Sequence, residues 1–296
     1  MKEITTKKPF STSRIPRPTR RYHVTTYPRL ANQHGFEGHG KTVLVTGGAS
    51  GVGYEISKAF ASHNIARLII VSRNREHQER AKAQLQRWFP SVEVVCHVVS
   101  ITDTERMVSI LSQSSTPDIV VLNAAMAHRR VEATAITPEE VQQSFETNVL
   151  ATFNIVQVYL NMSSRPSSGS KTIINVSSGA AHAQVPFRVA YGPSKAAAAQ
   201  ILHSFAAQFH ESDNVKVYSY HPGTFYTFGV AQNVPRDHMV WEDIRLPAHF
   251  ALWLAGPQSD FLHGKFLWAN WDVDELMELK PRVQVDPGFL TLGLIL

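Results

Sequence analysis

The chain has 296 residues, of which 43% are hydrophobic, so it can bury a full core within one domain. Its charge is unevenly spread: residues 1–41 hold nine Lys or Arg against two acidic residues, whereas residues 42–296 hold twenty against twenty-two. The near-neutral body excludes a basic nucleic-acid-binding surface, and the apolar runs, which have only strand length, exclude a membrane-spanning helix.

Residues 1–21 form a basic segment that is rich in Ser, Thr, Pro and Arg and lacks apolar periodicity, so we expect a disordered arm. An organelle-targeting peptide is the alternative, although Glu3 and four prolines by Pro28 disfavour an amphipathic helix. No secretory apolar segment is present, and we expect a cytoplasmic protein unless the arm directs it to an organelle. Residues 22–28 indicate an extended segment packed against the body.

A glycine-rich turn marks the start of regular structure. A short apolar strand over 42–46 leads into Gly47-Gly-Ala-Ser-Gly-Val-Gly53, and a helix is expected over 54–62. Gly47 permits the tight turn, Gly51 lets the backbone approach a pyrophosphate, and Gly53 permits close packing of helix against strand. A strand, glycine turn and helix in this order predict a dinucleotide-binding unit, with a plain glycine-rich turn as the alternative.

The second expected strand, 67–72, ends in Ser72 and Arg73. An acidic residue near this point would accept hydrogen bonds from the ribose hydroxyls of NAD, whereas a guanidinium suits the 2′-phosphate of NADP. Arg73 therefore predicts NADP(H). A solvated surface arginine is the alternative.

Strands and helices alternate along the rest of the chain. The expected strands are 92–99, 118–125, 172–176, 215–220 and 262–268, and the expected helices are 76–88, one from 102, 138–159, 193–210, 247–255 and 273–279. Thr137 is the expected N-cap of the long helix, with Glu140 completing a capping box. This alternation predicts an α/β fold of one domain over residues 22–296, with a doubly wound parallel sheet of the Rossmann type.

Two later segments depart from the alternation. Residues 225–245 are aromatic and irregular and lie between a strand and a helix, which predicts a substrate lid, with ordinary loop packing as the alternative. Residues 269–296 form a C-terminal extension, for which we expect a short helix at 273–279 followed by extended chain.

The stretch Tyr191-Gly-Pro-Ser-Lys195 carries acid/base chemistry. If a helix begins at Gly192-Pro193, Tyr191 and Lys195 project from one face, and the ammonium and the helix N-terminus both favour ionisation of the phenol. Ser178 follows the 172–176 strand, where its hydroxyl can hydrogen-bond a substrate carbonyl. Taken without the upstream motifs, a helix-start aromatic and a turn serine are the alternative.

In order and spacing these residues resemble the short-chain dehydrogenase/reductase family over about residues 40 to 270. The resemblance is carried by Thr46-Gly-Gly-Ala-Ser-Gly-Val-Gly53, Asn123-Ala-Ala125, Asn148, Ser178, Tyr191-x-x-x-Lys195 and Pro222-Gly-Thr-Phe-Tyr-Thr227. The segment from Phe261 to Leu276 is also similar to a fungal subgroup, many of whose members act in secondary metabolism. The chain departs from the family pattern at Ala125, where glycine is usual, and at Ser100, where aspartate is frequent.

The resemblance implies a catalytic tetrad. Tyr191 would exchange a proton with the substrate oxygen, and Lys195 would lower the pKa of the phenol and bind the nicotinamide ribose. Ser178 would hold the carbonyl oxygen, and Asn148 would position a water that connects Lys195 to solvent. Together with Arg73, the implied cofactor-binding residues are Gly47, Ser50, Gly51, Val52, Gly53, Asn123, Ala124, Tyr191, Lys195, Pro222, Gly223 and Thr227.

We therefore predict an NADP(H)-dependent oxidoreductase that interconverts a ketone and a secondary alcohol on a fairly hydrophobic small molecule. The alternatives are a non-redox enzyme that dehydrates, isomerises or cyclises its substrate, and an NADP(H)-binding sensor or scaffold without turnover. The fourteen histidines show no metal-ligand spacing, so we expect no metal site. Family analogy implies a homodimer or homotetramer built on the 138–159 and 193–210 helices.

Overall fold

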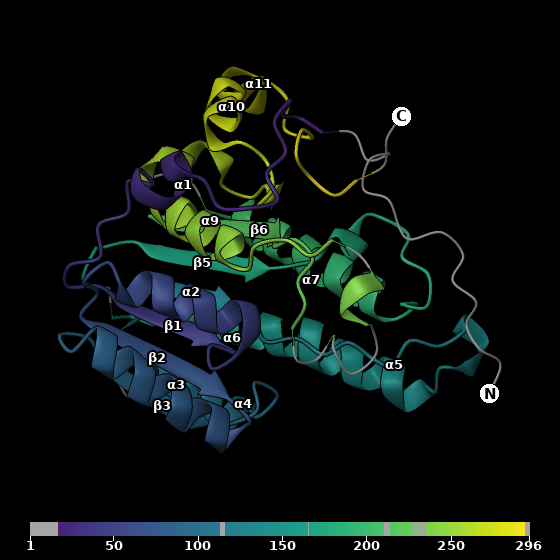
Figure 1. Ribbon diagram of the computed structural model, residues 1–296, viewed down its shortest axis with the longest axis horizontal. Helices are drawn as coiled ribbons and strands as arrows, with labels where there is room; N and C mark the ends of the chain where they lie inside the picture. The colour runs from purple at the N-terminus through teal and green to yellow at the C-terminus, as the bar shows by residue number, and fades with distance from the viewer. Residues whose placement is uncertain are drawn as a thin grey trace.

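The computed structural model describes residues 17–112, 116–164, 166–209, 214–227, 230, 235–238 and 240–293. These residues form one α/β domain with a central sheet and helices on both of its faces (Figure 1). Residues 1–16, which make up most of the predicted arm, lie outside the described residues, as do Phe228, Val234 and Met239 of the predicted lid.

The sheet has seven strands in the order β3-β2-β1-β4-β5-β6-β7, and every neighbouring pair is parallel. The strands are β1 (Thr42–Thr46), β2 (Arg67–Ser72), β3 (Glu93–Val98), β4 (Ile119–Leu122), β5 (Lys171–Val176), β6 (Val215–His221) and β7 (Phe266–Trp268). The central strands β1 and β4 are buried along their whole length, as expected for a parallel sheet covered on both sides. The predicted doubly wound sheet is confirmed. The order reverses between β1 and β4, which is where such sheets bind ligands.

Helices cover the two faces of the sheet and contribute to two hydrophobic clusters. The α-helices are α1 (Pro28–Asn32), α2 (Gly51–Ala61), α3 (Arg75–Trp88), α4 (Thr104–Ser112), α5 (Pro138–Phe145), α6 (Ala151–Asn161), α7 (Tyr191–Ala206), α9 (Arg245–Ala255), α10 (Val273–Glu278) and α11 (Lys280–Val285). Side chains alternate along β1: Val43 and Val45 join the cluster that contains α2, α3 and α9, and Leu44 joins the cluster that contains α4, α6 and α7. Figure 1 shows α2 and α9 side by side over the sheet.

The long helix predicted over 138–159 is three elements. The capping box at its start is confirmed, since Thr137 Oγ1 accepts from the Glu140 amide at 3.3 Å and Glu140 Oε2 accepts from the Thr137 amide at 3.1 Å. After α5 the chain widens into a π-helix over Glu146–Leu150 and then continues as α6. A single π-turn inside an α-helix often marks a functional site, and this one contains Asn148.

The last predicted segments also differ in detail. The helix expected over 193–210 begins at Tyr191 and ends at Ala206. The chain after 279, expected to be extended, forms α11 because Lys280-Pro281 starts a second short helix against α10. No helix among the described residues is long and apolar enough to cross a membrane.

The two ends of the described chain lie against the body. The segment from residue 17 to 27 contacts the C-terminal extension: the Arg20 amide donates to Glu275 Oε2 at 2.5 Å, and the His23 amide donates to the Asn270 carbonyl at 2.7 Å. The predicted extended segment 22–28 is thus packed on the body up to the start of α1.

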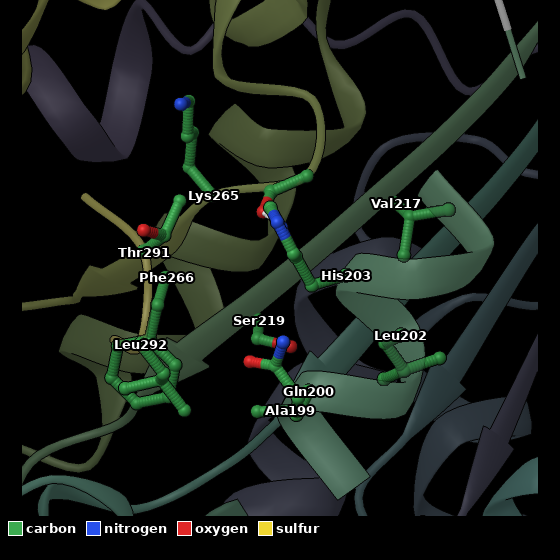
Figure 2. A pocket seen from close by; sticks show the side chains of 11 residues that line it. Ala199, Gln200, Leu202, His203, Val217, Ser219, Lys265, Phe266, Thr291 and Leu292 are labelled. Carbon is green, nitrogen blue, oxygen red and sulfur yellow. Dashed lines mark hydrogen bonds between the residues drawn. The ribbon is translucent and has the colours of Figure 1, made fainter. Parts of the chain in front are cut away.

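The C-terminal tail returns to lie beside β7, where the Phe266 amide donates to the Leu290 carbonyl at 2.7 Å. Figure 2 shows a hollow between α7, β6, β7 and this tail, lined on the tail side by Thr291 and Leu292. Its volume of about 10 Å³ is that of roughly one water-sized probe, so it cannot hold a substrate.

Candidate active site

A cleft of about 1030 Å³ runs along the carboxyl ends of the strands. It spans the point where the strand order reverses, and its volume suits a dinucleotide together with a small molecule. Its lining includes Gly47, Ser50, Gly51, Val52, Gly53, Arg73, Asn123, Ala124, Tyr191, Lys195, Pro222 and Thr227 among the predicted site residues. Asn148, Ser178 and Gly223 are not part of this lining.

The glycine turn is shaped to receive an anion at the start of α2. Gly47 and Gly51 have φ of +67° and +55°, values that side chains disfavour. A Cβ on Gly53 would lie 2.3 Å from the carbonyl oxygen of Gly47, so the third glycine is required by close packing. Ser50 is the N-cap residue of α2, yet its side chain makes no capping hydrogen bond. The amides at this helix start therefore have no side-chain cap, and they fit a pyrophosphate.

The carboxyl end of β2 presents one arginine to the cleft. Ser72 accepts a hydrogen bond from Gln78 Nε2 at 2.9 Å, and Asn74 caps α3 by accepting from the His77 amide at 2.8 Å. Arg73 is exposed and makes no ion pair or side-chain hydrogen bond with the described residues. Its guanidinium is available to an anion at this end of the cleft.

Asn123 and Thr46 hold the glycine turn against β4. Thr46 Oγ1 accepts from the amides of Asn123 and Ala124 at 2.9 and 3.0 Å. The Asn123 side chain donates to the carbonyls of Thr46 and Gly47 at 3.0 and 3.3 Å. Asn123 therefore fixes the glycine turn through hydrogen bonds to its backbone. Thr46 is its partner, a role that the sequence did not indicate.

Tyr191 and Lys195 both project from the start of α7 into the cleft. Lys195 is 4% exposed, and its ammonium donates to the Val176 carbonyl at the end of β5 at 2.8 Å. Burial lowers the pKa of Lys195 to about 8. The ammonium is therefore held at the sheet edge by a backbone carbonyl.

Burial raises the pKa of Tyr191, and two neighbours oppose that rise: a hydrogen bond with the Ser178 side chain and the positive charge of Arg188. The Arg188 Cζ atom lies 5.9 Å from the centre of the Tyr191 ring. The expected effect of Lys195 on the phenol stays a prediction; its ammonium bonds the Val176 carbonyl, and Arg188 is a second cation that lowers the pKa of Tyr191. Arg188 was missed, and its place three residues before the tyrosine was the only available signal.

Ser178 is positioned by a histidine from the next strand. It is the N-cap of a short 3-10 turn, Gly179–Ala181, and its Oγ accepts from the Ala180 amide at 3.2 Å. The Gly179 amide donates to His221 Nδ1 at 2.8 Å. Burial lowers the pKa of His221 to about 3, so this ring stays neutral and keeps its acceptor nitrogen. Sequence reasoning also missed His221, which directly precedes Pro222.

Asn148 joins the π-helix to two other parts of the site. Its Oδ1 accepts from the Met126 amide at 2.8 Å, and its Nδ2 donates to the Met126 carbonyl at 2.8 Å and to Ser194 Oγ at 2.9 Å. Ser194 in turn donates to the Tyr191 carbonyl at 2.9 Å. Both amide hydrogens of Asn148 are thus used within the protein, and its side chain fixes the loop after β4 against α7.

A second histidine ties the same loop to the start of α7. His128 is 2% exposed; its Nε2 accepts from the Ala190 amide at 3.2 Å, and its Nδ1 faces the Arg129 carbonyl at 2.6 Å. In the opposite direction, Arg188 Nη1 donates to the His128 carbonyl at 2.5 Å. The loop after β4 and the loop before α7 are therefore joined beside Tyr191.

The described part of the predicted lid is anchored at its base. Gly223 has φ of +111°, and Glu242 accepts from the Thr224 amide at 2.8 Å and from Asn270 Nδ2 at 3.1 Å. Further along, the rings of Tyr226 and Trp241 are 5.2 Å apart. No group of three or more metal-ligating side chains occurs among the residues that the structure describes.

Comparisons with known proteins place the chain among close and distant relatives. A family model described as short chain dehydrogenase matches residues 41–237. The chain is 53% identical over 279 residues to the short chain dehydrogenase/reductase AacuD of Aspergillus aculeatus, covering 94% of this chain and 97% of that protein. It is 44% identical over 297 residues to a short chain dehydrogenase/reductase of Claviceps purpurea, covering 100% of both.

Solved structures share the fold. L-sorbose reductase from Gluconobacter frateurii, solved with NADPH and L-sorbose, matches with a TM-score of 0.69 and 20% identity, over 79% of this chain and 96% of that one. A 7α-hydroxysteroid dehydrogenase solved with NADH matches with a TM-score of 0.71 and 20% identity, over 81% and 96%. At these identities the likeness concerns the fold, and the two structures hold different nicotinamide cofactors.

Proposed function

The chain belongs to the short-chain dehydrogenase/reductase family, and from this we propose that it is an NADP(H)-dependent oxidoreductase that interconverts a ketone and a secondary alcohol. We further propose that the substrate is a fairly hydrophobic small molecule of secondary metabolism. The fungal origin of the similar proteins supports that setting, and the aromatic residues Phe225, Tyr226 and Trp241 support an apolar substrate.

The observation that carries this proposal is the meeting of three features in one cleft. The phenol of Tyr191, the ammonium of Lys195 and the glycine turn all line it. The Ser178 side chain lowers the pKa of the Tyr191 phenol. A dinucleotide seated on the turn and reaching along the carboxyl ends of the strands would end beside the phenol. The small hollow beside the C-terminal tail is lined by none of these groups.

The geometry of these residues supports a division of labour among them. When bound, the nicotinamide cofactor supplies or accepts the hydride. Tyr191 gives its proton to the substrate oxygen during reduction and takes it back during oxidation, while Ser178 holds that oxygen by a hydrogen bond. Lys195, already directed to the sheet edge, binds the nicotinamide ribose hydroxyls. Asn148 holds the loop after β4 against α7. Both of its side-chain hydrogens are used, so a water that connects Lys195 to solvent would bond to the Asn148 side-chain oxygen or to its backbone.

We assign NADP(H) rather than NAD(H) on the strength of Arg73. Its guanidinium is exposed, stands at the end of β2 and faces the cleft without an acidic partner in the described chain. Ser72 and Asn74 beside it are neutral, so no carboxylate is present at this point to bind ribose hydroxyls. Gly51 and Val52 would bring the backbone to the pyrophosphate, and Thr227 would flank the nicotinamide carboxamide.

The substitution Tyr191→Phe tests the reaction. We expect NADPH-dependent reduction of a ketone substrate to fall by about 10²–10⁴-fold, because the proton donor is lost, while NADPH binds with nearly unchanged affinity. The measurements are NADPH oxidation followed by absorbance and NADPH affinity followed by fluorescence. Activity that stays within about tenfold of the wild type would remove Tyr191 from the role of acid.

The same assays separate the other candidate functions. Substrate conversion without any change in NADPH absorbance would identify a non-redox enzyme. NADPH binding without turnover of any ketone or alcohol would identify a sensor or scaffold. The second outcome is not expected, because a protein that only binds the cofactor has no chemical need for Ser178, Tyr191 and Lys195 together.

We also propose a homodimer or homotetramer formed through the surfaces of α5, α6 and α7. Leu150 lies at the junction of the π-helix and α6 and is 55% exposed, which suits a contact with another copy. A cytoplasmic location also stays part of the proposal.

A further inference from the structure

We propose that Arg188 and Arg130 form a subsite that binds an anionic oxygen group of the substrate, such as a carboxylate, next to Tyr191. This inference rests on the proposed function, because it assumes that the substrate carbonyl lies at the Tyr191 phenol. It adds a substrate class: an acidic carbonyl compound, or the corresponding acidic alcohol.

The first argument is the position of Arg188. Its Cζ atom is 5.9 Å from the centre of the Tyr191 ring, and its Nη1 donates to the His128 carbonyl at 2.5 Å. Tyr191 lines the cleft from α7, and Met126 and Ala127, directly before His128, line it from the loop after β4. The guanidinium is therefore held next to these two walls, just outside the lining of the cleft, at the end that carries the reacting phenol.

The second argument is the charge balance. Arg188 is half-buried, and burial together with the nearby charge of Arg130 lowers its pKa. Neither Arg188 nor Arg130 forms an ion pair with an acidic side chain in the described chain. By contrast, the neighbouring Arg129 pairs with Glu140 at 2.8 Å. Arg130 is exposed and its charge is screened by solvent, so the main cost is the desolvation of Arg188, which an anionic ligand bound to its guanidinium would offset.

The third argument is the backbone between the two arginines. Phe187 has φ of +63°, a left-handed conformation that is strained for an aromatic residue. The Arg130 Cζ atom lies 6.0 Å from the centre of its ring, and Arg188 follows it directly in the chain. The strained residue thus presents its ring to Arg130, from the loop after β4, and is followed by Arg188, which lies beside Tyr191. Strain of this kind is retained where the surrounding structure uses the geometry it produces.

Two arginines also suit the chemistry better than one. The charge of Arg188 opposes the burial of the Tyr191 phenol, and an anion bound to Arg188 alone would cancel that help. With Arg130 present, one anion leaves one net positive charge beside the phenol. The pair can therefore recognise an acidic substrate without removing the field that favours proton transfer.

The test uses matched acids and esters. The probes are 2-, 3- and 4-acetylbenzoate and their methyl esters, each titrated by calorimetry into the full chain in the presence of saturating NADP⁺. NADPH oxidation is followed with the same six compounds. The variants are Arg188→Gln, which keeps an N–H for the His128 carbonyl, and Arg130→Gln, with Arg129→Gln as the matched control because that arginine already has Glu140 as its partner.

We expect the wild type to bind at least one acid about tenfold or more tighter than its ester, because charge-assisted hydrogen bonds to a carboxylate have about that strength. Arg188→Gln should reduce this preference to near unity, Arg130→Gln should reduce it several-fold, and Arg129→Gln should leave it unchanged. Unaltered NADPH affinity and circular dichroism in each variant show that the fold is intact.

Equal binding of acids and esters by the wild type, no binding of any acid, or a preference that survives Arg188→Gln would overturn the subsite. The proposed reaction is judged separately by NADPH oxidation. Tight acid binding without turnover of any probe or its alcohol would support the subsite and contradict the reaction for this class. Turnover without acid preference would support the reaction and contradict the subsite.

Discussion

At one end of the cleft, the turn from Gly47 to Gly53 presents backbone, whereas at the other end Tyr191 and Lys195 present side chains. The turn end has no ionisable side chain in those seven residues, and its shape follows from two positive φ values and one close approach of backbone to backbone. The tyrosine end is held by buried side chains that bond to backbone groups from other strands and loops.

The difference teaches how each end does its work. A pyrophosphate is bound by amides that any residue can offer, so the turn end needs only space and direction. Proton transfer requires particular side chains at particular distances, so the tyrosine end needs positioning residues such as His128, His221 and Asn148. Substitutions at the turn end should therefore act on cofactor affinity at any pH, and those at the tyrosine end should act on chemistry and on its pH dependence.

The largest change at the turn end is expected for Gly53→Ala. Alanine favours the helix by about 1 kcal/mol, but its Cβ would lie 2.3 Å from the Gly47 carbonyl and 2.4 Å from Asn123 Nδ2. Backbone cannot rotate out of the way, and overpacking costs about 1–3 kcal/mol, so the clash prevails and the turn must shift. Affinity for NADPH and NADH should both fall by about tenfold to a hundredfold, as measured by fluorescence titration.

Gly288→Ala is the matched control for this substitution. Its Cβ would meet only Asp286 Oδ1 at an ordinary 3.5 Å, and the residue lies in the C-terminal tail. Cofactor affinity should be that of the wild type. Normal binding by Gly53→Ala would show that the tight turn is not required, and the proposed contrast between the two ends would lose its basis.

Arg73→Ala should give a smaller and selective effect. The side chain is exposed, so we expect about a tenfold loss of NADPH affinity, at the low end for a charge-assisted contact to phosphate, and little change for NADH. Arg75→Ala is the control, since Arg75 belongs to the same exposed helix start and does not line the cleft. Equal losses for both cofactors would refute the assignment of Arg73 to the 2′-phosphate.

The same contrast explains what the sequence could predict. The turn end follows from local signals, because the strand, glycines and helix that form it lie within about twenty consecutive residues, and the strand alternation then predicts the doubly wound sheet. The capping box of Thr137 and Glu140 is equally local, and the structure contains it. Tyr191 and Lys195 share one helical face because their spacing of four residues places them there.

The positioning of the tyrosine end could not be predicted, because it depends on contacts between distant residues. Arg188 bonds His128 across 60 positions, and Gly179 bonds His221 across 42. The π-helix around Asn148 arises where that side chain bonds Met126, 22 positions earlier. No periodicity or propensity marks such pairs, and for the same reason the sequence did not reveal Arg188 as a cation beside the phenol.

The smallest expected effect is a change of NADPH affinity with pH, which should come from Lys195 at the tyrosine end and not from the turn end. Burial gives Lys195 a pKa of about 8, below its ordinary value of 10.5, so the ammonium is charged below pH 8 and loses its proton as the pH rises through that value. The neutral amine binds ribose hydroxyls less strongly. NADPH affinity should therefore fall several-fold between pH 7 and 9.5, a range in which the 2′-phosphate, with a pKa of about 6, stays ionised.

Lys195→Met should weaken NADPH binding and remove this change with pH, whereas Tyr191→Phe should retain it and Gly53→Ala should show it at lower affinity.

The free energy of unfolding gives a second, independent measure of the titration of Lys195. The unfolded chain keeps the lysine proton up to about pH 10.5 and the folded protein only to about 8, so this residue makes the free energy of unfolding rise with pH between these values. A binding step that persists in Lys195→Met would assign the titration to another group and would leave the tyrosine end without the ionisable ammonium on which the contrast depends.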